Sequence, residues 1–267
     1  MNRASGVVRI AHAYGNNREA LAVALAADVD MIEVDIWYRG GRIEIRHERR
    51  WSWLPLLGDK RGRALHAMGR FVIPLWSGYF VRPDFGTMRL DELLERTDGR
   101  KRLLLDVKAR KRGESAAFAS KLADTIARHD AGGWVAVCGQ YWPVIRDLRA
   151  VAPEIEVRYS MEWPLQWQRF VEMAPGDPGA RRVCIEHRFM DAEKQAFLEQ
   201  HAVDTYCWTV DDPAEAAALV NRGVDGITSN DLGLLAALPR SPGVSAQTRE
   251  KSDHPEESKD APNASED

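Results

Sequence analysis

The chain has 267 residues, of which 45% are hydrophobic, and its formal net charge at pH 7 is −3. This length suits one α/β barrel or two smaller domains, and the hydrophobic share is ample for a large buried core. A nearly balanced charge provides no basic footprint for a nucleic acid, so we expect no nucleic-acid partner.

Short apolar runs that are typical of β-strands alternate with helical patterns. The predicted strands cover 7–11, 31–36, 42–47, 102–108, 134–138, 154–160, 181–187, 204–210 and 224–228. The predicted helices cover 18–27, 90–96, 115–129, 143–151, 192–201 and 213–222. This alternation indicates a parallel sheet, closed or open. A barrel has eight strands, one fewer than predicted, and the Gly40-Gly41 pair resembles a hairpin turn that makes its neighbourhood the expected irregularity.

Two segments interrupt the alternation. Residues 49–89 show little periodicity, and residues 241–267 are rich in Ser, Pro, Glu, Asp and Lys. Such a tail cannot bury enough apolar surface to offset the entropy of ordering. We therefore predict one domain over 1–240 that contains an insertion at 49–89, followed by a disordered tail at 241–267.

The chain shows no predicted membrane span and no predicted secretion signal. The first apolar run, 7–11, is too short for a signal peptide, and no segment approaches the roughly 20 apolar residues of a membrane-spanning helix. The three cysteines, Cys138, Cys184 and Cys207, lie in or at the end of apolar runs without metal-ligand spacing, which predicts buried, reduced thiols. We expect a cytoplasmic protein.

Ionisable residues interrupt the predicted strands in a regular way. Glu33 and Asp35 lie two residues apart in the second run, so both side chains share one face of that strand. Asp106 and Lys108 repeat this spacing in the fourth run. The apolar neighbours of the first pair would face a helix layer, which directs the carboxylates toward the axis of a barrel.

Neighbouring carboxylates inside a barrel repel each other and need a counter-charge, which a divalent cation supplies. Hard Mg²⁺ or Ca²⁺ prefers such oxygen ligands. His12 follows the first run and His47 ends the third, close to where barrel enzymes place their active sites. Taken singly, each histidine is more often a capped or exposed residue, and an Asp-x-Lys pair is as often a salt bridge. Together they suit a metal-assisted phosphodiester reaction.

Four segments in order, IAHAYGNN, MIEVDIWYRGGRIEIRHE, LLLDVK and YCWTVDDPAEAAALVNRGVDGITSND, resemble the glycerophosphodiester phosphodiesterase family. The resemblance covers residues 7–232 and implies a TIM-type (β/α)8 barrel. It also implies two catalytic histidines and three metal ligands for one divalent cation, Mg²⁺ or Ca²⁺. The implied catalytic residues are His12 and His47, and the implied metal ligands are Glu33, Asp35 and Asp106.

The resemblance further implies residues that bind the substrate or its phosphate, namely Lys108, Trp208 and Asn16. Some positions depart from the family pattern. Ala13 stands where the family usually has Arg after the first histidine, and Asn16 or Asn17 is the nearest equivalent of a family asparagine. The third ligand is Asp106 where Glu is common.

The resemblance implies metal-dependent hydrolysis of glycerophosphodiesters to glycerol 3-phosphate and an alcohol, with two-histidine acid/base catalysis. Two alternatives remain open, a lysophospholipase D that acts on lysophospholipids at a membrane surface and a non-catalytic barrel that binds phospholipid headgroups. Residues 49–89 are basic and rich in aromatic residues, which suits either a peripheral membrane contact or a lid. The headgroup preference and the oligomeric state stay open.

Overall fold

The structure is a computed structural model that describes residues 6–47, 88–108 and 113–242, together with the backbone of three short strands at 57–59, 73–74 and 80–82. Those three strands, β4 (Leu57–Asp59), β5 (Ile73–Pro74) and β6 (Phe80–Arg82), form a small antiparallel sheet in the order β4-β6-β5. The remainder of the predicted insertion and the predicted tail beyond residue 242 lie outside the described residues. None of the described helices is long and apolar enough to cross a membrane.

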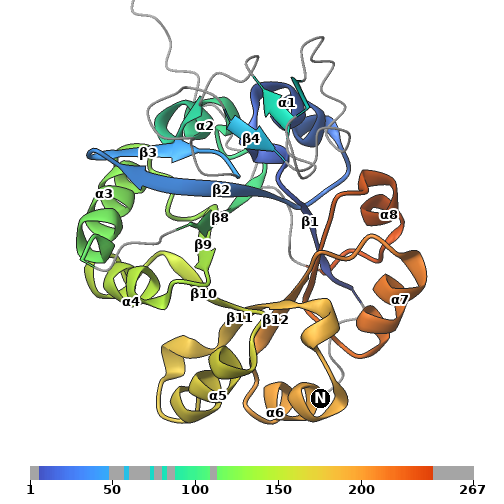
Figure 1. Ribbon diagram of the computed structural model, residues 1–267. Coiled ribbons are helices and arrows are strands. Elements are labelled where there is room, and N and C mark those ends of the chain that lie inside the picture. Colours follow the sequence, from blue (N-terminus) through green and yellow to red (C-terminus); the bar gives the residue numbers. More distant parts are fainter. Residues whose placement is uncertain are drawn as a thin grey trace, which may run out of the picture.

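The described residues form a closed barrel of eight parallel strands, as Figure 1 shows in a view along its axis. The ring runs β1-β13-β12-β11-β10-β9-β8-β2 and closes where β2 pairs with β1. Its strands are β1 (Val8–Ala11), β2 (Met31–Arg39), β8 (Arg102–Val107), β9 (Val135–Gly139), β10 (Glu156–Met161), β11 (Arg182–Glu186), β12 (Asp204–Trp208) and β13 (Gly226–Ser229). The predicted TIM-type barrel is confirmed.

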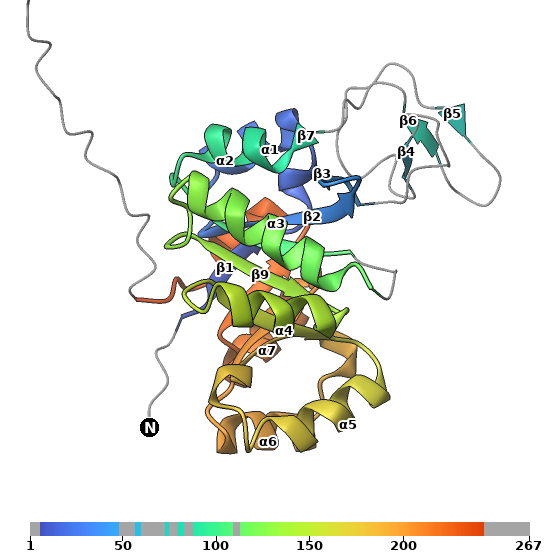
Figure 2. The ribbon, with the colours of Figure 1, turned by 90° about the vertical axis from the view of Figure 1, so that its left-hand side faces the viewer.

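Helices surround the barrel as an outer layer (Figures 1 and 2). They are α1 (Arg18–Ala26), α2 (Leu90–Thr97), α3 (Ser115–Arg128), α4 (Trp142–Val151), α5 (Pro164–Met173), α6 (Ala192–Gln200), α7 (Pro213–Asn221) and α8 (Leu232–Ala237), with short 3-10 turns η1 (Tyr14–Asn16), η3 (Pro178–Ala180) and η4 (His187–Phe189). Two of these helices, α5 and α8, were not predicted. Helix α5 fully buries only Phe170, and α8 is only six residues long, so neither leaves a clear periodic pattern in the sequence.

The expected irregularity lies at the hairpin. Strand β3 (Arg42–Ile45) pairs antiparallel with the end of β2 and also with β7 (Met88–Arg89), outside the closed ring. Gly40 and Gly41 have φ angles of 54° and 76°, which a two-residue turn of this kind requires and which residues with a Cβ rarely adopt. The predicted run 42–47 is therefore the accessory strand, and His47 lies just beyond its end.

Strand β2 alternates between the two sides of the barrel wall. Ile32, Val34 and Ile36 are fully buried and belong to the core between the strands and the helices. Glu33 and Asp35 are also buried, with 5% and 1% exposure. Below them a second apolar cluster fills the barrel interior, formed by Val8, Ile10, Met31, Leu104, Ala136, Cys138, Cys184 and Tyr206. The three cysteines are all free and buried, as predicted.

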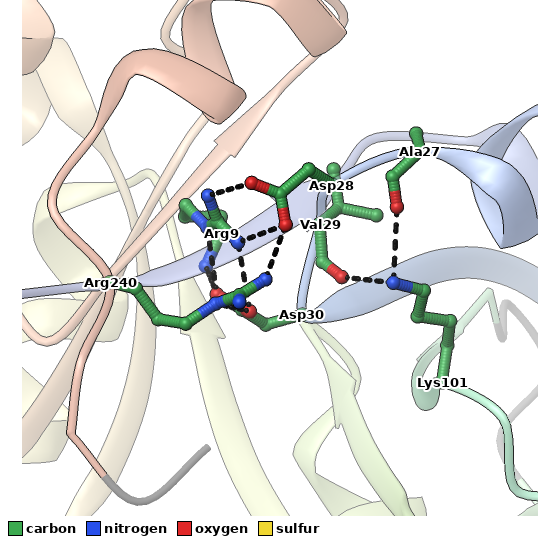
Figure 3. Close-up of polar contacts among 7 residues, drawn as sticks. All are labelled: Arg9, Ala27, Asp28, Val29, Asp30, Lys101 and Arg240. Carbon is green, nitrogen blue, oxygen red and sulfur yellow. Dashed lines mark hydrogen bonds and ion pairs between the residues drawn. The ribbon is translucent and has the colours of Figure 1, made fainter. Parts of the chain in front are cut away.

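Ion pairs tie the chain together at the end of the barrel where the strands begin (Figure 3). The Arg9 guanidinium donates to both carboxylate oxygens of Asp28 at 3.0 Å and to Asp30 at 3.0 Å. Arg240 donates to the same two carboxylates at 2.6 and 2.7 Å, and the amide of Val7 donates to the carbonyl of Pro239 at 2.8 Å. This network joins the first strand to the segment after α8.

We predict that removing Arg9 destabilises the fold much more than removing Arg240. The side chains of Arg9 and Asp30 are 3% and 1% exposed, so Arg9→Met leaves a buried carboxylate short of its counter-charge and should cost about 3–5 kcal/mol. The Arg240 side chain is 48% exposed, and Arg240→Met should cost about 1 kcal/mol or less. Urea unfolding of both variants measures the difference. Equal losses, or a larger loss for Arg240→Met, would contradict the assignment.

Candidate active site

A cavity of about 240 Å³ opens at the other end of the barrel, where the strands finish. Six of the eight predicted site residues line it, His12, Glu33, His47, Asp106, Lys108 and Trp208. Its remaining lining residues are Leu104, Cys138, Gln140, Ser160, Glu162, Cys184, Thr209 and Thr228. The fold therefore gathers groups from several strands, at the end of the barrel where barrel enzymes carry their chemistry.

Three carboxylates form the centre of this site. Glu33, Asp35 and Asp106 each place an oxygen within 4.8 Å of the others, because β2 and β8 are neighbours and Asp35 stands opposite Asp106 in their register. Among the residues that the structure describes, Oδ1 of Asp106 is buried and receives no hydrogen bond, and Oδ1 of Asp35 has only the ion pair with Lys108. Such oxygens are the donors that Mg²⁺ or Ca²⁺ binds, so the residues present fit a hard divalent cation.

The surroundings of Glu33 and Asp35 shift the pKa values of these two carboxyl groups in opposite directions. Burial, together with the charges of Asp35 and Asp106, raises the pKa of Glu33 well above its usual value. Burial would also raise the pKa of Asp35, but the charge of Lys108, the nearby histidines and a hydrogen bond from Asn16 outweigh it and hold the pKa at about 2. The raised pKa of Glu33 indicates that too little positive charge surrounds its carboxylate, and a bound cation would supply that charge.

Lys108 is the protein's own counter-charge. Its ammonium group bonds Asp106 and lies 3.0 Å from one oxygen of Asp35. Burial would lower the pKa of Lys108, but the three surrounding carboxylates outweigh it and raise the pKa well above the usual value. Lys108 is therefore charged and fixed at the edge of the acidic group. One ammonium cannot neutralise three carboxylates.

Hydrogen bonds from the turn after β1 hold two of these acids in place. The Ala13 amide donates to Glu33 at 2.6 Å, and the Asn16 side chain both donates to Asp35 (2.6 Å) and accepts from the Asp35 amide (2.8 Å). A Cβ on Gly15 would lie 2.1 Å from the Val34 side chain, so only glycine lets this turn approach β2 so closely. Asn16 does not line the cavity. Its amide holds Asp35 in place, which differs from the expected substrate contact.

A chain of hydrogen bonds that was not predicted orients His12. Asn230 donates through its side-chain amide nitrogen to Asp211 at 2.7 Å, which fixes the amide so that its oxygen faces His12. That oxygen lies 2.9 Å from Nδ1 of His12, so Nδ1 carries the proton and Nε2 is the basic nitrogen of the neutral ring. Nε2 lies 3.8 Å from Glu33. In the sequence, Asp211 and Asn230 are polar residues that follow the seventh and eighth barrel strands, which is a signal for a site residue. No local pattern, however, pairs either of them with His12.

The other two predicted residues lie on different sides of the cavity. His47 is partly buried just beyond β3, and its charge contributes to the low pKa of Asp35. Trp208 ends β12, and its indole N–H is buried without a hydrogen-bond partner in the part of the chain that the structure describes. A buried donor in a binding cavity is expected to find its partner in a ligand.

A larger cavity of about 530 Å³ lies at the opposite end of the barrel, but its charged groups are already paired. Arg158 donates to Glu156 at 2.8 Å and to both oxygens of Asp204, and Arg102 donates to Glu156 at 2.9 Å. The smaller cavity is instead lined by Asp106, one oxygen of which receives no hydrogen bond from the described residues. Chemistry, and not volume, identifies the smaller cavity as the candidate active site.

Comparison with known proteins supports the fold from structure alone, since no family model and no curated protein matches the chain. A Silicibacter pomeroyi protein, provisionally assigned as a glycerophosphoryl diester phosphodiesterase, has a TM-score of 0.66 and 21% identity over 87% of this chain and 93% of that chain. An Oleispira antarctica phosphodiesterase in complex with the product sn-glycerol-3-phosphate has a TM-score of 0.60 and 18% identity over 83% and 92%. A Thermotoga maritima glycerophosphodiester phosphodiesterase has a TM-score of 0.60 and 14% identity over 85% and 96%. This chain shares their fold.

We predict that Asn16→Ala weakens cation binding without unfolding the protein. The variant frees Asp35 from both of its bonds to Asn16, and the loss of such an orienting partner costs roughly 10- to 100-fold in metal affinity. Calorimetric titration with Mg²⁺ or Mn²⁺ measures it. Asn17→Ala is the matched control, because Asn17 caps α1 through the Ala20 amide and should lose about 1 kcal/mol of stability while keeping its affinity. Unchanged affinity in Asn16→Ala would remove this role.

Proposed function

We propose that this chain is a metal-dependent phosphodiesterase that hydrolyses glycerophosphodiesters to glycerol 3-phosphate and an alcohol. The observation that carries the proposal is the gathering of one lysine, two histidines and two carboxylates in one cavity, with the third carboxylate, Asp35, within 4.8 Å of the other two. The resemblance of the sequence segments that bear these residues and the fold shared with the phosphodiesterases named above support it. A protein that only bound headgroups would need no pair of proton-transferring histidines.

Glu33, Asp35 and Asp106 would hold one divalent cation, Mg²⁺ or Ca²⁺. When bound, the cation supplies Lewis-acid stabilisation of the negative charge that grows on the phosphoryl oxygens. Lys108 lies against Asp35 and Asp106, so its ammonium group meets the same phosphate and stabilises the same charge. Asn16 keeps Asp35 directed at the cation.

The two histidines move the protons of the reaction. One takes a proton from the attacking hydroxyl as its oxygen bonds phosphorus. The attacking group is water, which gives glycerol 3-phosphate directly, or a neighbouring hydroxyl of the substrate, which gives a cyclic phosphate that water then opens. The other histidine gives a proton to the alcohol oxygen as its bond to phosphorus breaks. The hydrogen bond at Nδ1 leaves Nε2 of His12 as the nitrogen that gains or loses a proton. His12 can therefore act as the base when its ring is neutral and as the acid when its ring is protonated. The buried indole N–H of Trp208 supplies a donor for a substrate oxygen.

The glycerophosphodiester is the substrate class that the comparisons favour, because the Oleispira antarctica phosphodiesterase is in complex with sn-glycerol-3-phosphate. A lysophospholipase D activity would depend on contact with a membrane through residues 49–89. Most of that segment lies outside the described residues, so no contact favours that activity here. The cytoplasmic location and the membrane contact stay predictions.

We predict that Asp35→Asn and Glu33→Gln abolish turnover of glycerophosphocholine while the circular dichroism spectrum stays native. Each substitution removes one carboxylate charge from the proposed ligand set, and a chelator should have the same effect on the unmodified enzyme. Glu19→Gln is the control, because Glu19 is exposed on α1 and should change nothing. Near-normal turnover of either variant in chelator would show that the metal assignment is wrong.

We also predict that His12→Ala and His47→Ala each lower kcat by at least roughly 10²-fold, as expected for a lost general acid or base. The double variant should lose much less than the product of the two, because the pair acts as a unit. His129→Ala serves as the control, since His129 bonds Asp91 at 3.1 Å and does not line the cavity. Full activity in either single variant would exclude that histidine from the mechanism.

A further inference from the structure

Glu162 is a charged residue of the cavity that the proposed reaction does not use. It follows the last residue of β10 and is partly buried, and its side chain lines the cavity. Its backbone amide donates to the Gln166 side chain at 2.9 Å, which fixes the chain at the start of α5. No ion pair of the Glu162 carboxylate is found among the residues that the structure describes.

The barrel places Glu162 on a different part of the cavity wall from the proposed metal ligands. In the ring of strands, β10 lies four places from β1 in either direction, so Glu162 and His12 stand on opposite walls. The proposed ligands belong to β2 and β8, and β8 lies two places from β10. Glu162 and Lys108 therefore line the same cavity from different strands. Ser160, two residues earlier on β10, lines the same wall.

Other carboxylates on this side of the rim are already engaged by the protein. Glu186 accepts hydrogen bonds from Arg188 and from the Phe189 amide at 2.7 and 3.0 Å. Asp211 accepts from Ser229 and Asn230 at 2.7 to 2.9 Å. Glu162 differs from both, because it lines the cavity and no such bond to its carboxylate is found within the described ranges.

A partly buried carboxylate in a cavity that takes a phosphodiester anion carries an electrostatic cost. The two negative charges repel each other in a medium less polar than water, and the repulsion lowers the affinity for any diester whose alcohol arm is neutral or anionic. A positive charge on that arm turns the repulsion into attraction. A zwitterion can place its phosphate at Lys108 and its cation at Glu162, which line the same cavity.

We propose that Glu162 selects diesters whose alcohol carries an ammonium group, so that the preferred substrates are zwitterionic glycerophosphodiesters. The proposal rests on the proposed function and adds the class of headgroup to it. Glu162 binds the part of the alcohol that is remote from phosphorus and takes no part in proton transfer. Its removal should therefore act on KM for ammonium-bearing substrates and leave the chemical step intact.

The experiment compares Glu162→Gln with the unmodified enzyme on glycerophosphocholine and on glycerophosphoglycerol, whose alcohol is uncharged. We expect kcat/KM for glycerophosphocholine to fall roughly 10- to 100-fold through KM, the size of one lost charge-assisted contact. Turnover of glycerophosphoglycerol should stay the same or improve. Glu172→Gln is the matched control, because Glu172 is exposed on α5 and its loss changes the net charge equally. Glu162→Lys should reverse the preference toward a diester whose alcohol carries a carboxylate and no ammonium group.

A binding measurement separates this proposal from the proposed function. Calorimetry with phosphocholine and with sn-glycerol 3-phosphate needs no turnover, and Glu162→Gln should weaken only phosphocholine. An enzyme that turned over neither diester but showed this selective loss would contradict the hydrolase function and support the headgroup site. Equal losses for both ligands, or no loss for phosphocholine, would overturn the role of Glu162.

Discussion

The mutual repulsion of three carboxylates inside a closed barrel is the constraint on which the rest of this site depends. Glu33, Asp35 and Asp106 lie within 4.8 Å of one another, and together with the single charge of Lys108 they remain net negative. Such an arrangement is costly unless a cation completes it. The Ala13 amide and the surrounding hydrogen bonds reduce the cost, yet one buried oxygen of Asp106 receives no hydrogen bond from the part of the chain that the structure describes. Stability is given up at this end of the barrel for a place where a cation and a phosphate can bind.

The two ends of the barrel handle charge in opposite ways. Where the strands begin, Arg9 and Arg240 saturate Asp28 and Asp30, and the network closes on itself. Where the strands finish, charges are left for ligands. The division follows from the fold, because loops at the finishing ends can vary while the beginning ends hold the first strand and the end of the barrel together. Polar contacts of equal strength thus serve stability at one end and chemistry at the other.

The loops add a layer of positioning around the acids. Asn230 and Asp211 fix the tautomer of His12, and Asn16 fixes Asp35. Each contact joins residues that are distant along the chain, so the geometry of the site is determined by the closure of the ring. The same closure puts Glu162 across from His12 and in the same cavity as Lys108.

Local patterns in the sequence were sufficient for the alternation of strands and helices and for the accessory hairpin, and the resemblance to a known family implied the closed barrel. Alternating apolar runs define strands, and the spacing of Glu33 and Asp35 places both on one face, because side-chain direction in a strand repeats every two residues. Helix α5 and the partners of His12 were not predictable in this way. His12 and Asn230 are 218 residues apart, and they meet only because β1 pairs with β13. Periodicity reports which side of its own element a residue faces, whereas contact between the ends of different strands depends on the closure of the whole barrel.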